Sequence, residues 1–330
     1  MMRTMATTTL KDVKDDLPDR MGAMLVKELR QNMRRASFVT PFLLVQLLAI
    51  AAMLVEFSGG DHRESLKFVG MLNLQLMAAS GPFWACVALI CIVIMPLGGL
   101  ILMGQELEEG NHELLLLTKL SRWKVVRGKF FTLWGLCVLT FISLLPYVIV
   151  RYLVGSIEFI REIGCSLTVI GMSGIVCAGT IGASSFRGLG ARLAVMVLFV
   201  ASAAGSCVLP LYAVAQRTDT CGVLYYINAI SCVICYCLLG LCMARSRLRL
   251  VVHAYEVKPS SMVVGLLIFT PFVTAMTTAM TLGYMGGAGL IGMALVAIYA
   301  DVTPKAPAWV KPPAPNVPPP AASPPPLLGA

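Results

Sequence analysis

The chain has 330 residues, of which 58% are hydrophobic and only 13% are charged, and its mean hydropathy is +0.81. Soluble domains carry roughly 25% charged residues, so this composition excludes a water-soluble globular protein and predicts a multi-pass membrane protein in contact with the lipid bilayer. The formal net charge is +9, but the basic residues lie in short segments between apolar runs. That placement indicates membrane topology, and we expect no nucleic acid partner.

The first 36 residues precede the first long apolar run. Residues 1–20 are polar and threonine-rich and lack the apolar region of a signal peptide, so we expect a disordered tail that is not cleaved. Residues 21–36 have apolar side chains at Met21, Leu25, Leu29 and Met33, and basic ones at Lys27, Arg30, Arg34 and Arg35. This spacing predicts an amphipathic interfacial helix lying on the cytoplasmic membrane surface. A soluble helix packed on its own chain is the alternative.

Apolar runs close to the roughly 20 residues needed to cross a membrane then follow one another. They cover about 38–57, 83–103, 130–153, 165–186, 193–215 and 222–244. We therefore predict an all-α fold, a polytopic transmembrane helical bundle with a core of about six spans over residues 37–258.

Two further segments follow this core. The apolar stretch within 259–302 is too long for one span and is glycine-rich near 283–289, which predicts an additional membrane hairpin. One span followed by a re-entrant piece is the alternative. Residues 303–330 are dominated by proline and are expected to form a disordered tail; an interaction tail is the other interpretation.

The segment between the second and third predicted spans, residues 105–129, is the most charged and most patterned part of the chain. Its first half is acidic and its second half basic, with the apolar block Leu114–Leu117 between them. Asn111 suits a helix N-cap, and Glu113 then lies in the first turn, where the helix dipole favours an acid. A short helix followed by a turn near Thr118–Ser121 is the resulting prediction. A solvated loop that only follows the positive-inside rule is the alternative.

Several of these residues resemble the loop after the second span in permease subunits of type-2 ABC exporters. The matching residues are Glu109, Gly110, Glu113, Leu114, Leu115, Leu116, Leu117, Thr118, Leu120, Ser121 and Arg122, followed by Gly128 and Lys129. Upstream, Lys27, Glu28, Leu29 and Arg30 resemble the family's entry helix. Lys119 departs from the family's pattern, in which proline is usual.

The resemblance implies that this loop is a coupling helix that docks on a separate ATPase subunit. It also implies an exporter with two permease chains, the second a copy or a paralogue, and two ATPase chains whose closure moves the coupling helices. Independently, Gly128-Lys129 is followed by Phe130 and has no glycine five residues earlier, so this is not a P-loop. We therefore predict no catalytic residue and no cofactor in this chain, with ATP hydrolysis in the partner.

Lys and Arg concentrate in alternate connecting segments. These are the N-terminal segment, residues 105–129, Arg187 with Arg192, and residues 245–258. By the positive-inside rule this bias predicts a cytoplasmic N-terminus and a cytoplasmic coupling loop. The expected location is the plasma (bacterial inner) membrane.

Polar groups within the predicted spans are few. No ionisable residue lies at a span centre, which argues against a carrier with its own proton relay. Glu56 and Arg151 lie near span ends, where long side chains can reach the interface. Gln46 and Asn228 lie deep in spans and are predicted to make interhelical hydrogen bonds.

Two motifs suggest other chemistry. Most of the 11 cysteines lie in apolar runs and are interpreted as small hydrophobic residues; Cys232-x-x-Cys235 has a metal-like spacing, but without a nearby second pair or histidine we predict no metal site. Gly171-Met172-Ser173-Gly174 matches the GxSG pattern of rhomboid-type intramembrane proteases. The histidines His62, His112 and His253 all fall in predicted loops, so we favour helix packing over a protease.

Two classes of function therefore remain open, with the protease a remote third. The first is a permease subunit of an ABC-type exporter, in which residues 105–129 transmit force. The second is a membrane-anchored structural or accessory protein without transport activity. The apolar spans suit lipids, peptides or drugs alike as cargo, so the sequence leaves the substrate undetermined.

Overall fold

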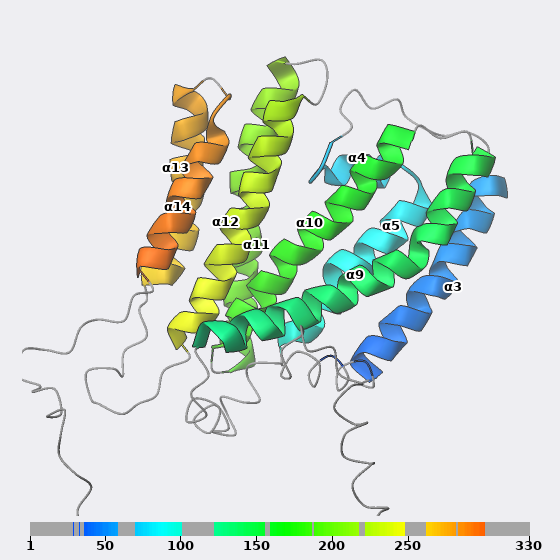
Figure 1. Cartoon of the computed structure of the whole chain (residues 1–330), viewed down its shortest axis with the longest axis horizontal. Helices are drawn as coiled ribbons and strands as arrows, with labels where there is room; N and C mark the ends of the chain where they lie inside the picture. The colour runs from blue at the N-terminus through cyan, green and yellow to red at the C-terminus, as the bar shows by residue number, and fades with distance from the viewer. Residues whose placement is uncertain are drawn as a thin grey trace, which may run out of the picture.

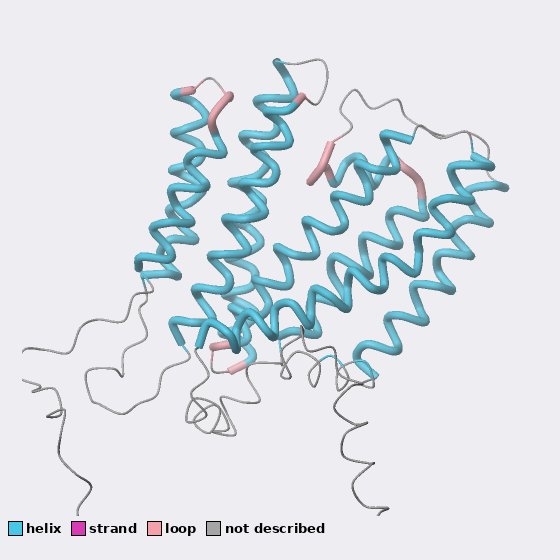
Figure 2. Tube along the Cα trace, viewed as in Figure 1, coloured by secondary structure: helices cyan, strands magenta, loops and turns pink. Residues whose placement is uncertain are grey.

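The computed structural model describes Leu29, Met33 and residues 36–58, 70–100, 122–155, 159–186, 188–217, 222–247, 262–281 and 283–300. These residues form helices and a few turns, with no strand among them (Figure 2). Within them, six helical segments are long and apolar enough to cross a membrane. The predicted fold class, an all-α polytopic transmembrane bundle, is confirmed.

The spans alternate in direction along the chain (Figure 1). Apart from the short pieces of the second span, the first helices are α3 (Ala36–Ser58), the short α4 (Leu74–Ala79), α5 (Pro82–Ala88), α9 (Arg122–Gly155) and α10 (Phe159–Ser184). They are followed by α11 (Leu189–Arg217), α12 (Val223–Arg247), α13 (Met262–Met280) and α14 (Gly286–Ala300).

The second span is irregular. It continues from α5 through a π-helical turn η1 (Leu89–Ile94), the short α6 (Met95–Leu97) and a 3₁₀ turn η2 (Gly98–Leu100). Pro96 has no backbone N–H to donate to the preceding turn, and the wider π turn lies directly before it. Residues 82–100 therefore cross the bundle as one span with three helical geometries.

Two helices begin earlier than the apolar runs predicted. Helix α9 starts at Arg122, so the basic segment before Phe130 is part of the helix. Helix α10 starts at Phe159 and includes Arg161 and Glu162, which were expected to lie between spans. Lys, Arg and Glu are good helix formers, so a helix continues past the end of the apolar run where nothing breaks it.

Helix α10 lies at the centre of the bundle. It packs against α9, α11, α12 and the second span, while α3 and α9 form one edge and α13 and α14 the other (Figure 1). Its contact with α12 depends on small residues, because a Cβ added at Gly240 would lie 2.5 Å from the backbone of Ala178. Glycine at this crossing allows the two backbones to approach closely, as in other membrane bundles.

Residues 262–300 form two helices joined by a turn. Helices α13 and α14 have 19 and 15 residues, which at 1.5 Å per residue give lengths of about 28 and 22 Å, below the roughly 30 Å hydrocarbon thickness. The side chain of Asn228 on α12 holds the start of α14, since its Oδ1 accepts a hydrogen bond from the Gly287 N–H at 2.5 Å.

The predicted hydrogen-bonding role of the two polar residues inside spans is confirmed. Gln46 on α3 donates from Nε2 to Ser143 Oγ on α9 at 2.6 Å, and Asn228 links α12 to α14. Of the predicted interfacial helix, only Leu29, Met33 and Ala36 are described, all helical. The tails predicted at 1–20 and 303–330 lie outside the described residues.

Candidate functional site

Most of the predicted coupling residues cannot be placed. Residues 101–121 lie outside the described part of the chain, as do Lys27, Glu28 and Arg30. Leu29 is helical, and Arg122 is the first residue of α9. The end of the second span and the start of α9, which flank the loop, lie at the same end of the bundle (Figure 1).

That end of the bundle is basic. The basic residues there are Arg122, Lys124, Arg127, Lys129, Arg192, Arg245 and Arg247. No Asp or Glu lies at this end within the described ranges. The guanidinium of Arg247 lies 3.5 Å from the Phe186 ring centroid and that of Arg245 lies 5.5 Å from the Trp123 ring centroid, geometries typical of cation–π contacts. We refer to this as the basic end.

The opposite end holds a buried ionic cluster centred on Arg151, whose side chain is 1% exposed. The Arg151 Nε and Nη2 donate to the Glu56 carboxylate at 2.9 and 2.6 Å, so the contact is bidentate. Its Nη1 donates to Glu162 Oε1 at 2.9 Å, and Nη2 also donates to the Ser80 carbonyl. One guanidinium therefore joins the C-terminal parts of α3 and α9 to the first turn of α10 and the α4–α5 turn.

Two further groups complete the ionic cluster. Arg161 donates from Nε to Ser80 Oγ at 2.9 Å and from Nη2 to the Ala79 carbonyl at 2.7 Å. Trp84 donates from its indole N–H to Glu162 Oε2 at 3.0 Å. Both oxygens of the Glu162 carboxylate therefore accept hydrogen bonds from different helices.

Local backbone features bring these groups together. Gly81 joins α4 to α5 with φ of +108°, in the region that favours glycine. A Cβ there would lie 3.1 Å from Glu56 Oε1 and 3.3 Å from Arg151 Nη2, so glycine also leaves space for the ion pair. Glu162 lies in the first turn of α10, where the helix dipole stabilises a carboxylate.

The arrangement suits a contact that holds helix ends together better than a catalytic centre. Removing these charges from water is costly, and the bidentate contact and the hydrogen bonds offset that cost only while the helix ends stay together. No group of three or more His, Cys, Asp or Glu side chains able to hold a metal occurs within the described residues. The ionic cluster is thus a candidate for a connection that forms or breaks as the helices move.

The sequence placed Glu56 and Arg151 near the ends of spans, but it did not reveal the ionic cluster. Glu56 and Arg151 were expected to reach the interface, whereas Arg151 is buried, the Glu56 side chain is only 9% exposed, and the two are paired with each other. Their opposite charges, at the C-terminal ends of the first and third spans, were the available signal. Whether such a side chain reaches the interface or turns inward to an opposite charge depends on which helices are neighbours. The periodicity of the sequence does not show which helices are neighbours.

The cysteine interpretation requires one correction. Cys207 on α11 and Cys232 on α12 are paired as a disulfide, so these two are not merely small hydrophobic residues. The pairing was missed because the two residues lie on different spans and nothing in their spacing brings them together. It also removes Cys232 from the metal-like Cys232-x-x-Cys235 motif.

The environment of the GxSG motif is that of packed helices. Ser173 is buried and donates to the Ile170 carbonyl at 3.0 Å, within its own helix. A Cβ added at Gly174 would lie 3.3 Å from Trp134 Nε1, and one at Gly171 would lie 2.6 Å from Met71 Cε. The three histidines lie outside the described residues. These contacts favour the packing interpretation of the motif.

Comparisons with protein-family models, with curated proteins and with solved structures gave no match. The function of this multi-pass membrane protein must therefore be inferred from its own residues.

Proposed function

We propose that this chain is the membrane-spanning permease subunit of an ATP-driven exporter, coupled to a separate ATPase subunit. The observation that carries the proposal is the continuity of α9, which has 34 residues and leads from the end of the coupling loop to the buried ionic cluster. One helix therefore connects the segment that resembles a coupling helix with the ionic cluster at the other end of the bundle.

The ionic cluster is sensitive to movement of this helix. Arg151 lies on α9, while its partners Glu56 and Glu162 lie on α3 and α10. N–H···O hydrogen bonds in proteins have donor–acceptor distances of about 2.7–3.2 Å, so a tilt that moves the end of α9 by a few ångströms would separate these groups. In the proposed mechanism, ATPase closure moves residues 105–129, α9 tilts, and the connection between the three helix ends opens.

The assembly follows from the same proposal. Two permease chains, identical or paralogous, would combine with two P-loop ATPases in the plasma membrane. The ATPases would bind at the basic end, which is then cytoplasmic, as is the N-terminus. The distribution of charge supports this orientation, because Lys and Arg residues gather at one end of the described bundle.

Orientation can be tested by labelling single cysteines. In a background that retains only Cys207 and Cys232, a cysteine at Asn111 should react with an impermeant maleimide only after the membrane is permeabilised. A cysteine at Gly222, directly before the start of α12 at the opposite end of the bundle, is the matched control and should react in intact cells (Figure 1). The reverse pattern would refute the proposed orientation.

The need for a partner gives a second test. The purified chain should show no ATP hydrolysis above background, because it lacks a P-loop. Purified from its native membrane under mild conditions, the tagged chain should carry with it a P-loop ATPase whose activity is sensitive to the chain. Hydrolysis that remains with the chain alone through successive purification steps would overturn the proposal.

A further inference from the structure

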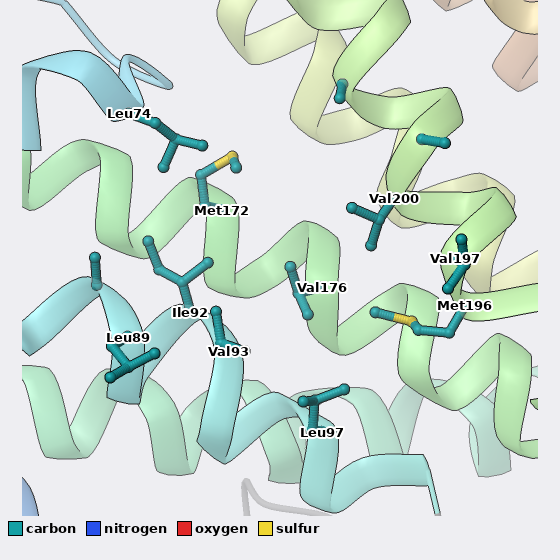
Figure 3. A pocket seen from close by; sticks show the side chains of 13 residues that line it. Leu74, Leu89, Ile92, Val93, Leu97, Met172, Val176, Met196, Val197 and Val200 are labelled. Atoms are coloured by element: carbon teal, nitrogen blue, oxygen red, sulfur yellow. The ribbon is translucent and has the colours of Figure 1, made fainter. Parts of the chain in front are cut away.

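An apolar cavity of about 720 Å³ opens on the side of the bundle between the second span and α11. Helix α10 forms its floor, and side chains from all three segments converge on it (Figure 3). The lining residues are Leu74, Ala88, Leu89, Ile92, Val93, Leu97, Met172, Val176, Met196, Val197, Val200, Ala201 and Ala204. We refer to it as the lateral cavity.

The chemistry of the lining excludes a polar occupant. Every lining side chain is that of Ala, Val, Leu, Ile or Met, so neither water nor a polar ligand would find a hydrogen-bonding side chain. The volume falls within the roughly 300–1,000 Å³ typical of small-molecule sites. Met172 and Met196 are unbranched and can adapt to the shape of an occupant.

The position of the lateral cavity identifies the surrounding medium. Apart from Leu74 on α4, its lining residues belong to three segments long and apolar enough to cross a membrane, Pro82–Leu100, Phe159–Ser184 and Leu189–Ala215. Its α11 wall runs from Met196 to Ala204, about 12 Å at 1.5 Å per residue, close to half of the roughly 30 Å hydrocarbon core. Leu89 and Val197 on its walls are exposed, so the cavity opens sideways at the depth of lipid chains.

The cavity also has a defined orientation along the bundle. Its lining on the second span ends at Leu97, one turn before Leu100 at the basic end. The π-helical turn Leu89–Ile94 contributes three lining residues, so the irregular part of the second span forms its wall. Backbone irregularity of this kind is frequent at functional sites.

We propose that the lateral cavity binds one acyl chain of a phospholipid from the bilayer leaflet at the basic end. An acyl chain matches the apolar lining, the sideways opening and the length of one leaflet. The basic residues at that end favour an anionic headgroup, because juxtamembrane Lys and Arg attract anionic lipids. This site does not depend on the proposed ATPase partner.

Photo-cross-linking tests the site on the full chain in nanodiscs, without ATPase or nucleotide. The probe is phosphatidylglycerol with a diazirine midway along one acyl chain, present at low mole fraction. Peptides carrying the lateral-cavity residues of α11 should be labelled about tenfold more than those carrying exposed Phe272 on α13, equivalent to about 1.4 kcal/mol of preference. Labelling equal to that at Phe272 would overturn the proposal.

Filling the cavity provides the matched comparison. Ala204→Trp should abolish the excess labelling, whereas Val208→Trp, one turn further along α11 and outside the lining, should preserve it. Ala201→Met fills the same space with a smaller side chain and should reduce the excess if the tryptophan variant does not fold. Excess labelling that persists in a cavity-filling variant that still folds would contradict a lipid occupant. Cross-links between two protein chains through the cavity residues would also contradict it.

Discussion

Replacing Arg151 by methionine is expected to destabilise the folded protein by about 3–5 kcal/mol, because it leaves two buried carboxylates without their cation. Glu56 and Glu162 both direct oxygens at the Arg151 guanidinium, and both side chains are less than a tenth exposed. The substitution also removes the donor to the Ser80 carbonyl. The midpoint of thermal unfolding of the detergent-solubilised protein measures the effect.

The chain offers a matched control on the same helix. Arg127→Met makes the same chemical change at an exposed position near the other end of α9, and its unfolding midpoint should be close to that of the parent protein. Arg151→Lys keeps the charge but loses the bidentate geometry, so its stability should be intermediate. Equal midpoints for Arg127→Met and Arg151→Met would show that the ionic cluster does not stabilise this conformation.

Removing Arg151 together with its two carboxylate partners should be milder than removing Arg151 alone. In the variant Glu56→Gln, Arg151→Met, Glu162→Gln, no carboxylate is left buried without a cation, and most of the lost stability should return. If the triple variant is less stable than Arg151→Met, the remaining hydrogen bonds to the carboxylate oxygens matter more than the charges.

The fold class could be predicted from the sequence because the length of an apolar run is a direct physical requirement for crossing a membrane. The residues at which the helices begin and end could not be predicted in this way. Hydropathy marks where Phe130 begins an apolar run, but the helix begins at Arg122, since basic residues are compatible with helix geometry. The internal hydrogen bonds of Gln46 and Asn228 were predictable because a buried amide needs a partner whatever its neighbours are.

The ionic cluster shows what the sequence leaves open. A charged residue near a span end can extend to the interface or turn inward to an opposite charge, and both satisfy the same local pattern. The choice at Arg151 depends on α3 and α10 being its neighbours and on Gly81 leaving space beside it. The disulfide between Cys207 and Cys232 likewise depends on α11 lying beside α12. These are properties of the assembled bundle.

The coupling role proposed for residues 105–129 has its sharpest test in Leu115 and Leu116, which lie outside the described residues. If this segment inserts into a groove on an ATPase, its apolar side chains anchor the contact, while rim charges mostly steer association. Replacing both leucines by Asp would place unpaired charges in a desolvated pocket, at a cost of several kcal/mol.

The double variant Leu115→Asp, Leu116→Asp should therefore lose ATPase association and transport together, while its amount in the membrane stays at the parent level because the changes lie outside the spans. Glu108→Gln, a change at an acidic position in the same loop, should alter both by less than about twofold, as expected for a rim charge. Co-purification and export from proteoliposomes measure the two effects side by side. Should the double variant bind the ATPase and transport normally, the loop is only a connection. A membrane-anchored structural or accessory role then explains the chain better, and the buried ionic cluster is then a permanent connection between helix ends.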